Sequence, residues 1–235
     1  MRGRSGEVYP RDRQRHLFSA AARADQCASL RTLGVIGAMP ARSDISDKVI
    51  HFTRGATSED ALGCLLTIVG EGRLIGGNGM IRGGYRCVCF TEAPLPALAG
   101  GFVNADSFTR YSPFGLMFDK AWVFARGGRP VIYQPDGDFD ALPDDIRWRH
   151  VRYDPLGPSP INFTWEREWR IQTDSLVFSP ADAAIVVPDE SWEAFVRDIW
   201  DSQQDLESES YSTLFEQTIV EQLRDPFPWR MVRLS

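Results

Sequence analysis

Two glutamates, two tryptophans and two arginines occupy the short run "NFTWEREWRIQ" at residues 162–172. If this run is a β-strand, its side chains alternate between two faces with a period of two. One face then carries the carboxylates of Glu166 and Glu168, and the other carries the indoles of Trp165 and Trp169. We expect both indoles to be largely buried. Two neighbouring carboxylates repel each other unless a cation or a substrate lies against them, so the polar face is a candidate active site.

A structural explanation of the same run stays open. Glu166 and Glu168 could pair with Arg149, Arg167 or Arg170 in a surface network. Such exposed ion pairs contribute only about 0–1 kcal/mol each and are common on protein surfaces.

Two other polar stretches fall at or near the ends of expected strands. They are "HFTR" at 51–54 and "CFTEAP" at 89–94. Each has an ordinary structural interpretation, since a single histidine such as His51 is often a half-buried, hydrogen-bonded side chain. Thr91 and Glu92 could simply end a strand before Pro94. The order of the three stretches along the chain carries more information than any one of them.

The elements that must position these groups are short strands and short helices. The pattern predicts strands at 48–55, 85–94, 114–118, 129–135, 162–172 and 182–188, and helices at 57–74, 119–128, 190–200 and 210–223. Ser58 is the expected N-cap of the first helix, and the run 146–155 fits either helix or strand. Because regular βαβ spacing is absent, we expect a single α+β domain over 48–235, with a split, mostly antiparallel sheet flanked by helices. Residues 1–47 are expected to form an appended helical segment.

Composition sets broad limits on function. The chain has 235 residues, a formal net charge of −6 and 43% hydrophobic residues, which suits one soluble domain with a sizeable core. The acidic balance argues against a broad nucleic-acid-binding surface. No apolar run reaches the roughly 18 residues of a membrane span, and no apolar signal-peptide core follows the basic N-terminus. We therefore expect a cytoplasmic protein.

The cysteines and histidines do not form a metal-binding pattern. Cys87 and Cys89 are two residues apart in an apolar stretch, which is typical of a strand and differs from the C-x-x-C spacing of zinc or redox sites. The three histidines are scattered along the chain. We expect structural cysteines and no metal.

The runs "VIHFTRG", "CVCFTEAPLPAL", "FTRYSPFGLMFDKAW" and "FTWEREWRI", taken in this order, resemble the AbiGi-type phage-resistance proteins over roughly residues 48–190. The resemblance implies an effector in bacterial anti-phage defence, of the abortive-infection or toxin–antitoxin kind. A cognate toxin or antitoxin protein is then an expected partner.

A more distant resemblance is to ADP-ribosyltransferases. These enzymes carry a His or Arg on a first strand, an aromatic-Ser/Thr motif on a second, and E-x-E or a lone Glu later; here "HFT", "CFTE" and "EREW" follow that order. The DarT group similarly has an H-x-T strand and a downstream Ser-Pro segment like "RYSPFG". The resemblance implies a transferase that takes ADP-ribose from NAD, its substrate, to a nucleic-acid or protein acceptor.

The same resemblance assigns roles to particular residues. Glu168 is the expected catalytic carboxylate, which stabilises an oxocarbenium-like centre as carboxylates do in glycoside cleavage, and Glu166 would orient or deprotonate the acceptor. The expected NAD-binding residues are His51, Thr53, Arg54, Phe90, Thr91, Arg110 and Tyr111. Of these, Phe90 or Tyr111 would stack on nicotinamide, and Arg54 or Arg110 would bind the pyrophosphate.

One departure from the transferase pattern matters. Glu92 stands where the motif has serine, and a carboxylate beside NAD would repel its phosphates. The alternative hypothesis is therefore a non-catalytic antitoxin or interaction module on a degenerate transferase scaffold, with the glutamates in structural ion pairs.

Overall fold

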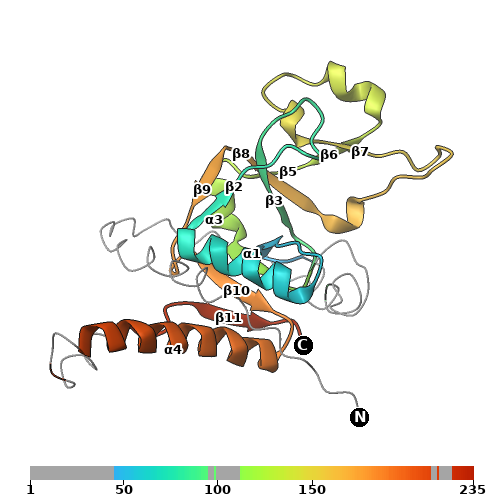
Figure 1. The fold of residues 1–235 in the computed structure, drawn as a ribbon. Coiled ribbons are helices and arrows are strands. Elements are labelled where there is room, and N and C mark those ends of the chain that lie inside the picture. Colours follow the sequence, from blue (N-terminus) through green and yellow to red (C-terminus); the bar gives the residue numbers. More distant parts are fainter. Residues whose placement is uncertain (1–44, 95–97, 99–111, 213–215, 217–223) are drawn as a thin grey trace, which may run out of the picture.

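The fold is known from a computed structural model, which describes residues 45–94, 98, 112–212, 216 and 224–235 (Figure 1). Most of the expected N-terminal segment at 1–47 lies outside these residues, as do Arg110, Tyr111 and most of the expected helix at 210–223.

A seven-stranded sheet with the order β11-β10-β4-β1-β3-β8-β5 forms the centre of the molecule. Its strands are β1 (Lys48–Phe52), β3 (Cys87–Thr91), β4 (Gly115–Asp119), β5 (Arg129–Pro130), β8 (Glu168–Gln172), β10 (Ala183–Val187) and β11 (Arg230–Arg233). Neighbours in this sheet are antiparallel except β10 and β11, which are parallel. The predicted α+β class and mostly antiparallel sheet are thus confirmed.

Two small sheets accompany the large one. β2 (Arg73–Ile75) pairs antiparallel with β9 (Ser175–Val177), and β6 (Ile132–Gln134) pairs parallel with β7 (His150–Arg152). The sequence analysis missed β2 and β9. It also predicted one strand at 129–135, which is wrong, because this run contributes β5 to the large sheet and β6 to a small one.

Helix α1 (Ser58–Glu71) shows why its sequence is helical. Thr57 is the N-cap, and its side chain and that of Asp60 form a reciprocal capping box; the expected N-cap, Ser58, is instead the first helical residue. The helix ends at Gly72, whose φ of 63° is the left-handed conformation that glycine adopts without strain. Between these ends, an apolar stripe is buried: Ala61, Leu62, Leu65, Leu66 and Val69.

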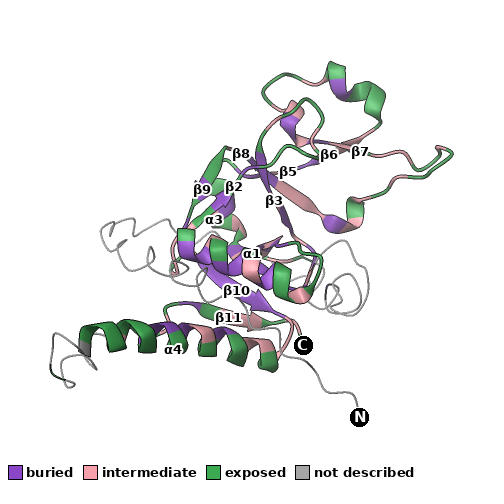
Figure 2. Cartoon of the chain, viewed as in Figure 1, coloured by how far each residue is buried: buried purple, intermediate pink, exposed green. Residues whose placement is uncertain are grey.

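The other helical elements are shorter or more peripheral. Within the described residues they are α3 (Lys120–Ala125), α4 (Glu190–Ser212) and the 3-10 helices η4 (Asp136–Ala141), η5 (Arg147–Arg149) and η6 (Thr164–Glu166). The ambiguous run at 146–155 therefore contains η5 and then β7. Figure 2 shows α4 with a largely exposed outer surface, while β10 is buried along its whole length. Among the described helices, none has the length and apolarity needed to cross a membrane.

The largest core cluster joins the sheet to α1, α3 and α4. Leu65 of α1, Val123 of α3 and Val196 of α4 pack with sheet residues such as Phe118 and Ile185. Phe118 is 1% exposed and stacks on Trp122 at a centroid distance of 5.0 Å. Edge-to-face contacts to Phe90 and Phe178 complete its surroundings. This cluster fixes the strands that carry the candidate site.

The large sheet opens between β1 and β3. These strands share a single aligned pair, Ile50 with Thr91, whereas β1 pairs with β4 and β3 with β8 along five residues each. Beyond Ile50, the imidazole Nδ1 of His51 lies 2.8 Å from the carbonyl oxygen of Cys89, in place of a backbone hydrogen bond. All seven strands belong to one sheet, so the predicted split is not seen as two separate sheets; the pairing is only reduced between β1 and β3.

Candidate functional site

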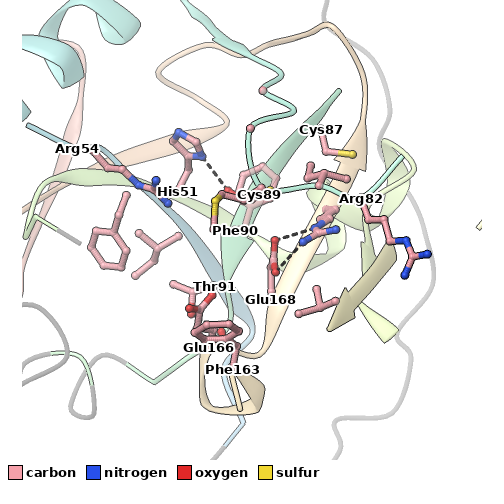
Figure 3. A pocket seen from close by; sticks show the side chains of 18 of the residues that line it. His51, Arg54, Arg82, Cys87, Cys89, Phe90, Thr91, Phe163, Glu166 and Glu168 are labelled. Atoms are coloured by element: carbon pink, nitrogen blue, oxygen red, sulfur yellow. Dashed lines mark hydrogen bonds and ion pairs between the residues drawn. The ribbon is translucent and has the colours of Figure 1, made fainter. Parts of the chain in front are cut away.

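A cavity of about 620 Å³ lies where β1 and β3 separate (Figure 3). Small-molecule sites in proteins commonly measure about 300–1,000 Å³, so the cavity is of a suitable size. Its walls come from β1, α1, β3 and β8, from the glycine-rich segment after β2, and from β7 and the segment before η6.

Every predicted site residue that the structure describes lines this cavity: His51, Thr53, Arg54, Phe90, Thr91, Glu166 and Glu168. Arg110 and Tyr111 lie outside the described residues. In Figure 3 the side chains of His51, Cys89 and Glu168 gather around one space, with Glu166 beside Thr91. Residues from three separate strands or strand ends are thus brought together, as the order of the motifs predicted.

The strand that carries the glutamates is shorter than predicted. Residues Thr164–Glu166 form η6, Arg167 adopts a left-handed φ of 45°, and β8 begins only at Glu168. The prediction of one continuous strand over 162–172 is therefore wrong in its first half. A local cause is Asn162, whose side-chain oxygen accepts hydrogen bonds from the backbone N–H and hydroxyl of Thr164 and so favours a turn.

The turn is attached to β3 through Thr91. The Thr91 hydroxyl donates to the carbonyl of Glu166 at 2.5 Å and accepts from the backbone N–H of Ala93 at 3.1 Å. A hydrogen bond from the backbone N–H of Glu92 to the carbonyl of Arg167 links the two segments a second time. Thr91 therefore holds Glu166 at the cavity. It does so even though Glu166 lies before β8, so that the alternation of side chains along a strand does not relate Glu166 to Glu168.

The prediction that Trp165 and Trp169 are both largely buried is wrong. Trp165 and Trp169 are only half-buried, whereas Glu166 and Arg170 are each 4% exposed. Trp169 packs at the margin of the core and donates its indole N–H to Glu92. The guanidinium of Arg170 lies against the backbone carbonyls of Trp148 and His150, to which it donates hydrogen bonds.

Glu168 is held by a buried arginine. Arg170 Nε donates to Glu168 Oε1 at 2.7 Å, and Arg170 Nη2 donates to Oε2 at 3.2 Å. Burial acts to lower the pKa of Arg170, but the adjacent Glu168 carboxylate outweighs it and leaves that pKa above its ordinary value. The ion pair considered in the sequence analysis does form, but it is enclosed and bidentate, unlike a typical surface pair.

Glu92 lies outside the cavity lining. Its carboxylate accepts from Lys120 Nζ at 2.8 Å and from the Trp169 indole at 2.7 Å. The expected repulsion between Glu92 and the phosphates of NAD is therefore weakened, because Lys120 compensates the charge and Glu92 does not line the cavity.

The protonation of His51 follows from its contacts. The carbonyl of Cys89 can only accept, so the Nδ1 atom facing it carries the proton. Burial lowers the pKa of His51, so its ring is neutral at pH 7. The other nitrogen, Nε2, then carries a lone pair that can accept a hydrogen bond from a ligand.

Two side chains that were predicted to bind NAD, those of Thr53 and Phe90, instead make contacts inside the protein. The Thr53 hydroxyl is 2.9 Å from the carbonyl of Ala61 and 3.1 Å from that of Phe114, which ties α1 and β4 to the end of β1. Phe90 is 3% exposed and packs edge-to-face on Phe118, so in this conformation its ring is placed to fill the core and not to stack on a ligand. Arg54 is exposed and lies beside His51.

The sequence analysis missed the cavity wall formed by the segment "GGNGMIRGG" at 76–84. Five glycines in nine residues were the available signal. At Gly76 a Cβ atom would lie 2.0 Å from the carbonyl of Thr173, so glycine is required there for the close backbone approach. Arg82 pairs with Asp136 at 2.8 Å, and both line the cavity.

Three cysteines also line the cavity, namely Cys64, Cys87 and Cys89. Burial raises the pKa of Cys87 to about 11, and burial together with Glu168 raises that of Cys89 further. Both thiols are therefore protonated and weakly nucleophilic at pH 7. Within the described part of the chain, no group of three or more His, Cys, Asp or Glu side chains is arranged to hold a metal ion.

Comparison with known proteins adds no assignment: no family model matches the chain, and no curated protein or solved structure is significantly similar to it.

Proposed function

We propose that the protein is an NAD-dependent ADP-ribosyltransferase whose active site is the cavity between β1, β3 and β8. The observation that carries this proposal is that Glu166, Glu168 and His51, which come from distant parts of the sequence, line a single cavity of about 620 Å³. The order of the motifs "HFT", "CFTE" and "EREW" supports the same assignment through their resemblance to ADP-ribosyltransferases.

The proposed reaction cleaves the bond between nicotinamide and its ribose. Nicotinamide leaves with the bonding electron pair, and the Glu168 carboxylate stabilises the positive charge that develops on the ribose. A nucleophilic atom of the acceptor then bonds to the anomeric carbon, and its proton passes to Glu166. The enclosed position of Glu166 strengthens electrostatic interactions at this point, since little water is present to screen them.

His51 and Arg54 are the proposed binding groups. The lone pair on His51 Nε2 accepts from a hydroxyl or amide N–H of NAD, and exposed Arg54 offers a guanidinium to the pyrophosphate. We further propose, on the sequence resemblance alone, that the enzyme acts in the cytoplasm as an anti-phage effector that modifies a nucleic acid or protein.

One observation favours a second candidate, an interaction module on a degenerate scaffold. Both carboxylate oxygens of Glu168 already accept hydrogen bonds from Arg170. A purely structural ion pair shows the same geometry, so the two candidates must be separated by ligand binding and activity.

Thermal unfolding with NAD separates them. At 100 times its dissociation constant, a ligand that binds only the folded state stabilises it by about 2.7 kcal/mol. For a chain of this size, the melting temperature should rise by roughly 5–10 °C. An interaction module that does not bind NAD predicts no rise.

Two glycine variants provide the control. A Cβ atom added at Gly77, which lines the cavity, or at Gly137, which lies outside the lining, meets no atom within 4 Å. Gly77→Phe places a ring at the cavity wall and should lose the NAD-dependent rise, whereas Gly137→Phe should keep it; the melting temperature without NAD shows whether each variant is folded. A rise of equal size in both variants would place NAD elsewhere.

A further inference from the structure

Arg170 is among the most enclosed charged groups of the described chain, with 4% of the residue exposed. Its guanidinium makes four hydrogen bonds. Two go to the oxygens of Glu168, and the Nη1 atom donates to the backbone carbonyls of Trp148 at 2.9 Å and His150 at 3.0 Å. Dashed lines in Figure 3 mark the two bonds to Glu168.

These bonds join two parts of the cavity. Trp148 belongs to η5 and His150 opens β7, whose residues His150, Val151 and Arg152 line the cavity wall. Glu168 lies on β8 in the large sheet, whereas β7 belongs to the small sheet with β6. The guanidinium of Arg170 thus holds the carboxylate and this wall at a fixed separation.

Stability alone does not explain an arginine at this position. Placing two charges out of water costs several kcal/mol per ion, and well-packed apolar side chains often replace a buried ion pair without loss of stability. An arginine contributes something that an apolar residue cannot, namely a planar fork that fixes both oxygens of a carboxylate in one orientation.

We infer that Arg170 is a positioning residue for catalysis: it orients the Glu168 carboxylate relative to the cavity wall formed by β7. This inference rests on the proposed transferase function. Because Glu168 acts on charge that develops only in the transition state, an incorrectly oriented carboxylate lowers kcat and leaves the KM for NAD nearly unchanged.

The test compares Arg170→Lys, Arg170→Met and Arg129→Lys. Lysine keeps the charge but lacks the planar fork, and methionine keeps much of the length without any donor. Arg129 is the control, because it is the aligned partner of Arg170 across β5 and β8, and its guanidinium bonds the carbonyls of Phe124 and Gly128. Each variant is assayed for nicotinamide release from NAD and for melting temperature.

We expect kcat per folded molecule to fall roughly 10-fold in Arg170→Lys and about 100-fold in Arg170→Met, the scale of a small misplacement of a catalytic group. KM should change less than twofold, and Arg129→Lys should match the wild type in both parameters. If Arg170→Met does not fold, the comparison of the two lysine variants decides the question.

The outcomes separate the inference from the proposed function. If the wild-type protein releases no nicotinamide, the proposed function fails and the inference fails with it. If the wild type is active but Arg170→Lys keeps the kcat of Arg129→Lys, only the inference is overturned. The same holds if Arg170→Lys loses activity only in proportion to its folded fraction.

Discussion

Replacement of Glu168 by glutamine is expected to lower the rate of nicotinamide release by roughly 10²–10³-fold, the usual effect of removing one electrostatic stabiliser of a transition state. Glutamine keeps the size of the side chain and one oxygen that can accept from Arg170 Nε. It removes the negative charge that the developing positive charge on the ribose requires. KM for NAD should change little, since the charge acts mainly in the transition state.

The same substitution should also cost stability, because Arg170 loses a charged partner in an enclosed site. The loss of a hydrogen bond to a charged group costs about 1.5–3 kcal/mol. Glu92→Gln is the matched control: the Glu92 side chain is 15% exposed and paired with Lys120, and that of Glu168 is 13% exposed and paired with Arg170. Glu92 lies outside the cavity lining.

Activity per folded molecule distinguishes the two variants. Glu92→Gln should lose stability of the same order and keep its kcat, whereas Glu168→Gln should lose both. If Glu168→Gln keeps the kcat of Glu92→Gln, once both are corrected for the folded fraction, the Glu168–Arg170 pair is structural and Glu168 is not the catalytic carboxylate.

Replacement of Phe118 by alanine should lower the free energy of unfolding by about 3–5 kcal/mol. Phe118 is 1% exposed and contacts Phe90, Trp122 and Phe178. Its removal leaves a cavity in the cluster that joins β4 to α3, and the rigid sheet cannot collapse fully around it.

Phe124→Ala is the control for Phe118→Ala, since it makes the same chemical change at a side chain that is 51% exposed. It removes the surface contact with Arg129, whose guanidinium carbon lies 3.9 Å from the ring centroid, and should cost less than about 1 kcal/mol. Urea unfolding measures both values. Similar losses in the two variants would mean that the core is not centred on Phe118.

Elements with a strong local signal could be predicted from the sequence. α1 has a capping box, an apolar stripe and a terminal glycine, and each of these acts within a few residues. β10 is the apolar run "AAIVV", which is typical of a strand buried on both faces. The predicted and observed elements agree in kind at both places.

Elements that depend on distant partners could not be predicted. β2 and β9 have three residues each and form only because they pair with each other across about a hundred residues of sequence. β8 starts at Glu168 because Arg167 takes a left-handed conformation, which is rare for arginine and has no sequence signal. Val131 lies between β5 and β6, and its backbone N–H donates a hydrogen bond to the carbonyl of Glu168. No local sequence pattern indicates this contact.

The candidate site shows the same division. Motif order predicted which strands meet, and His51, Glu166 and Glu168 do line one cavity. Thr53 and Phe90 make interior contacts because of the position at which β1 separates from β3. That position is a property of the whole sheet and not of any local motif. The contact of Arg170 with Glu168 could be predicted, because residues two apart on a strand lie on the same face. The hydrogen bonds of Arg170 to the carbonyls of Trp148 and His150 could not be predicted in this way.

The most direct test is an experimental structure of the protein with a non-hydrolysable NAD analogue. The account predicts that the analogue occupies the cavity between β1, β3 and β8. It also predicts that a Glu168 oxygen lies within hydrogen-bond distance, about 2.6–3.2 Å, of a hydroxyl on the nicotinamide ribose. An analogue bound elsewhere on the surface would contradict the account. An empty cavity at saturating concentration, with Glu168 contacting only Arg170, would contradict it equally.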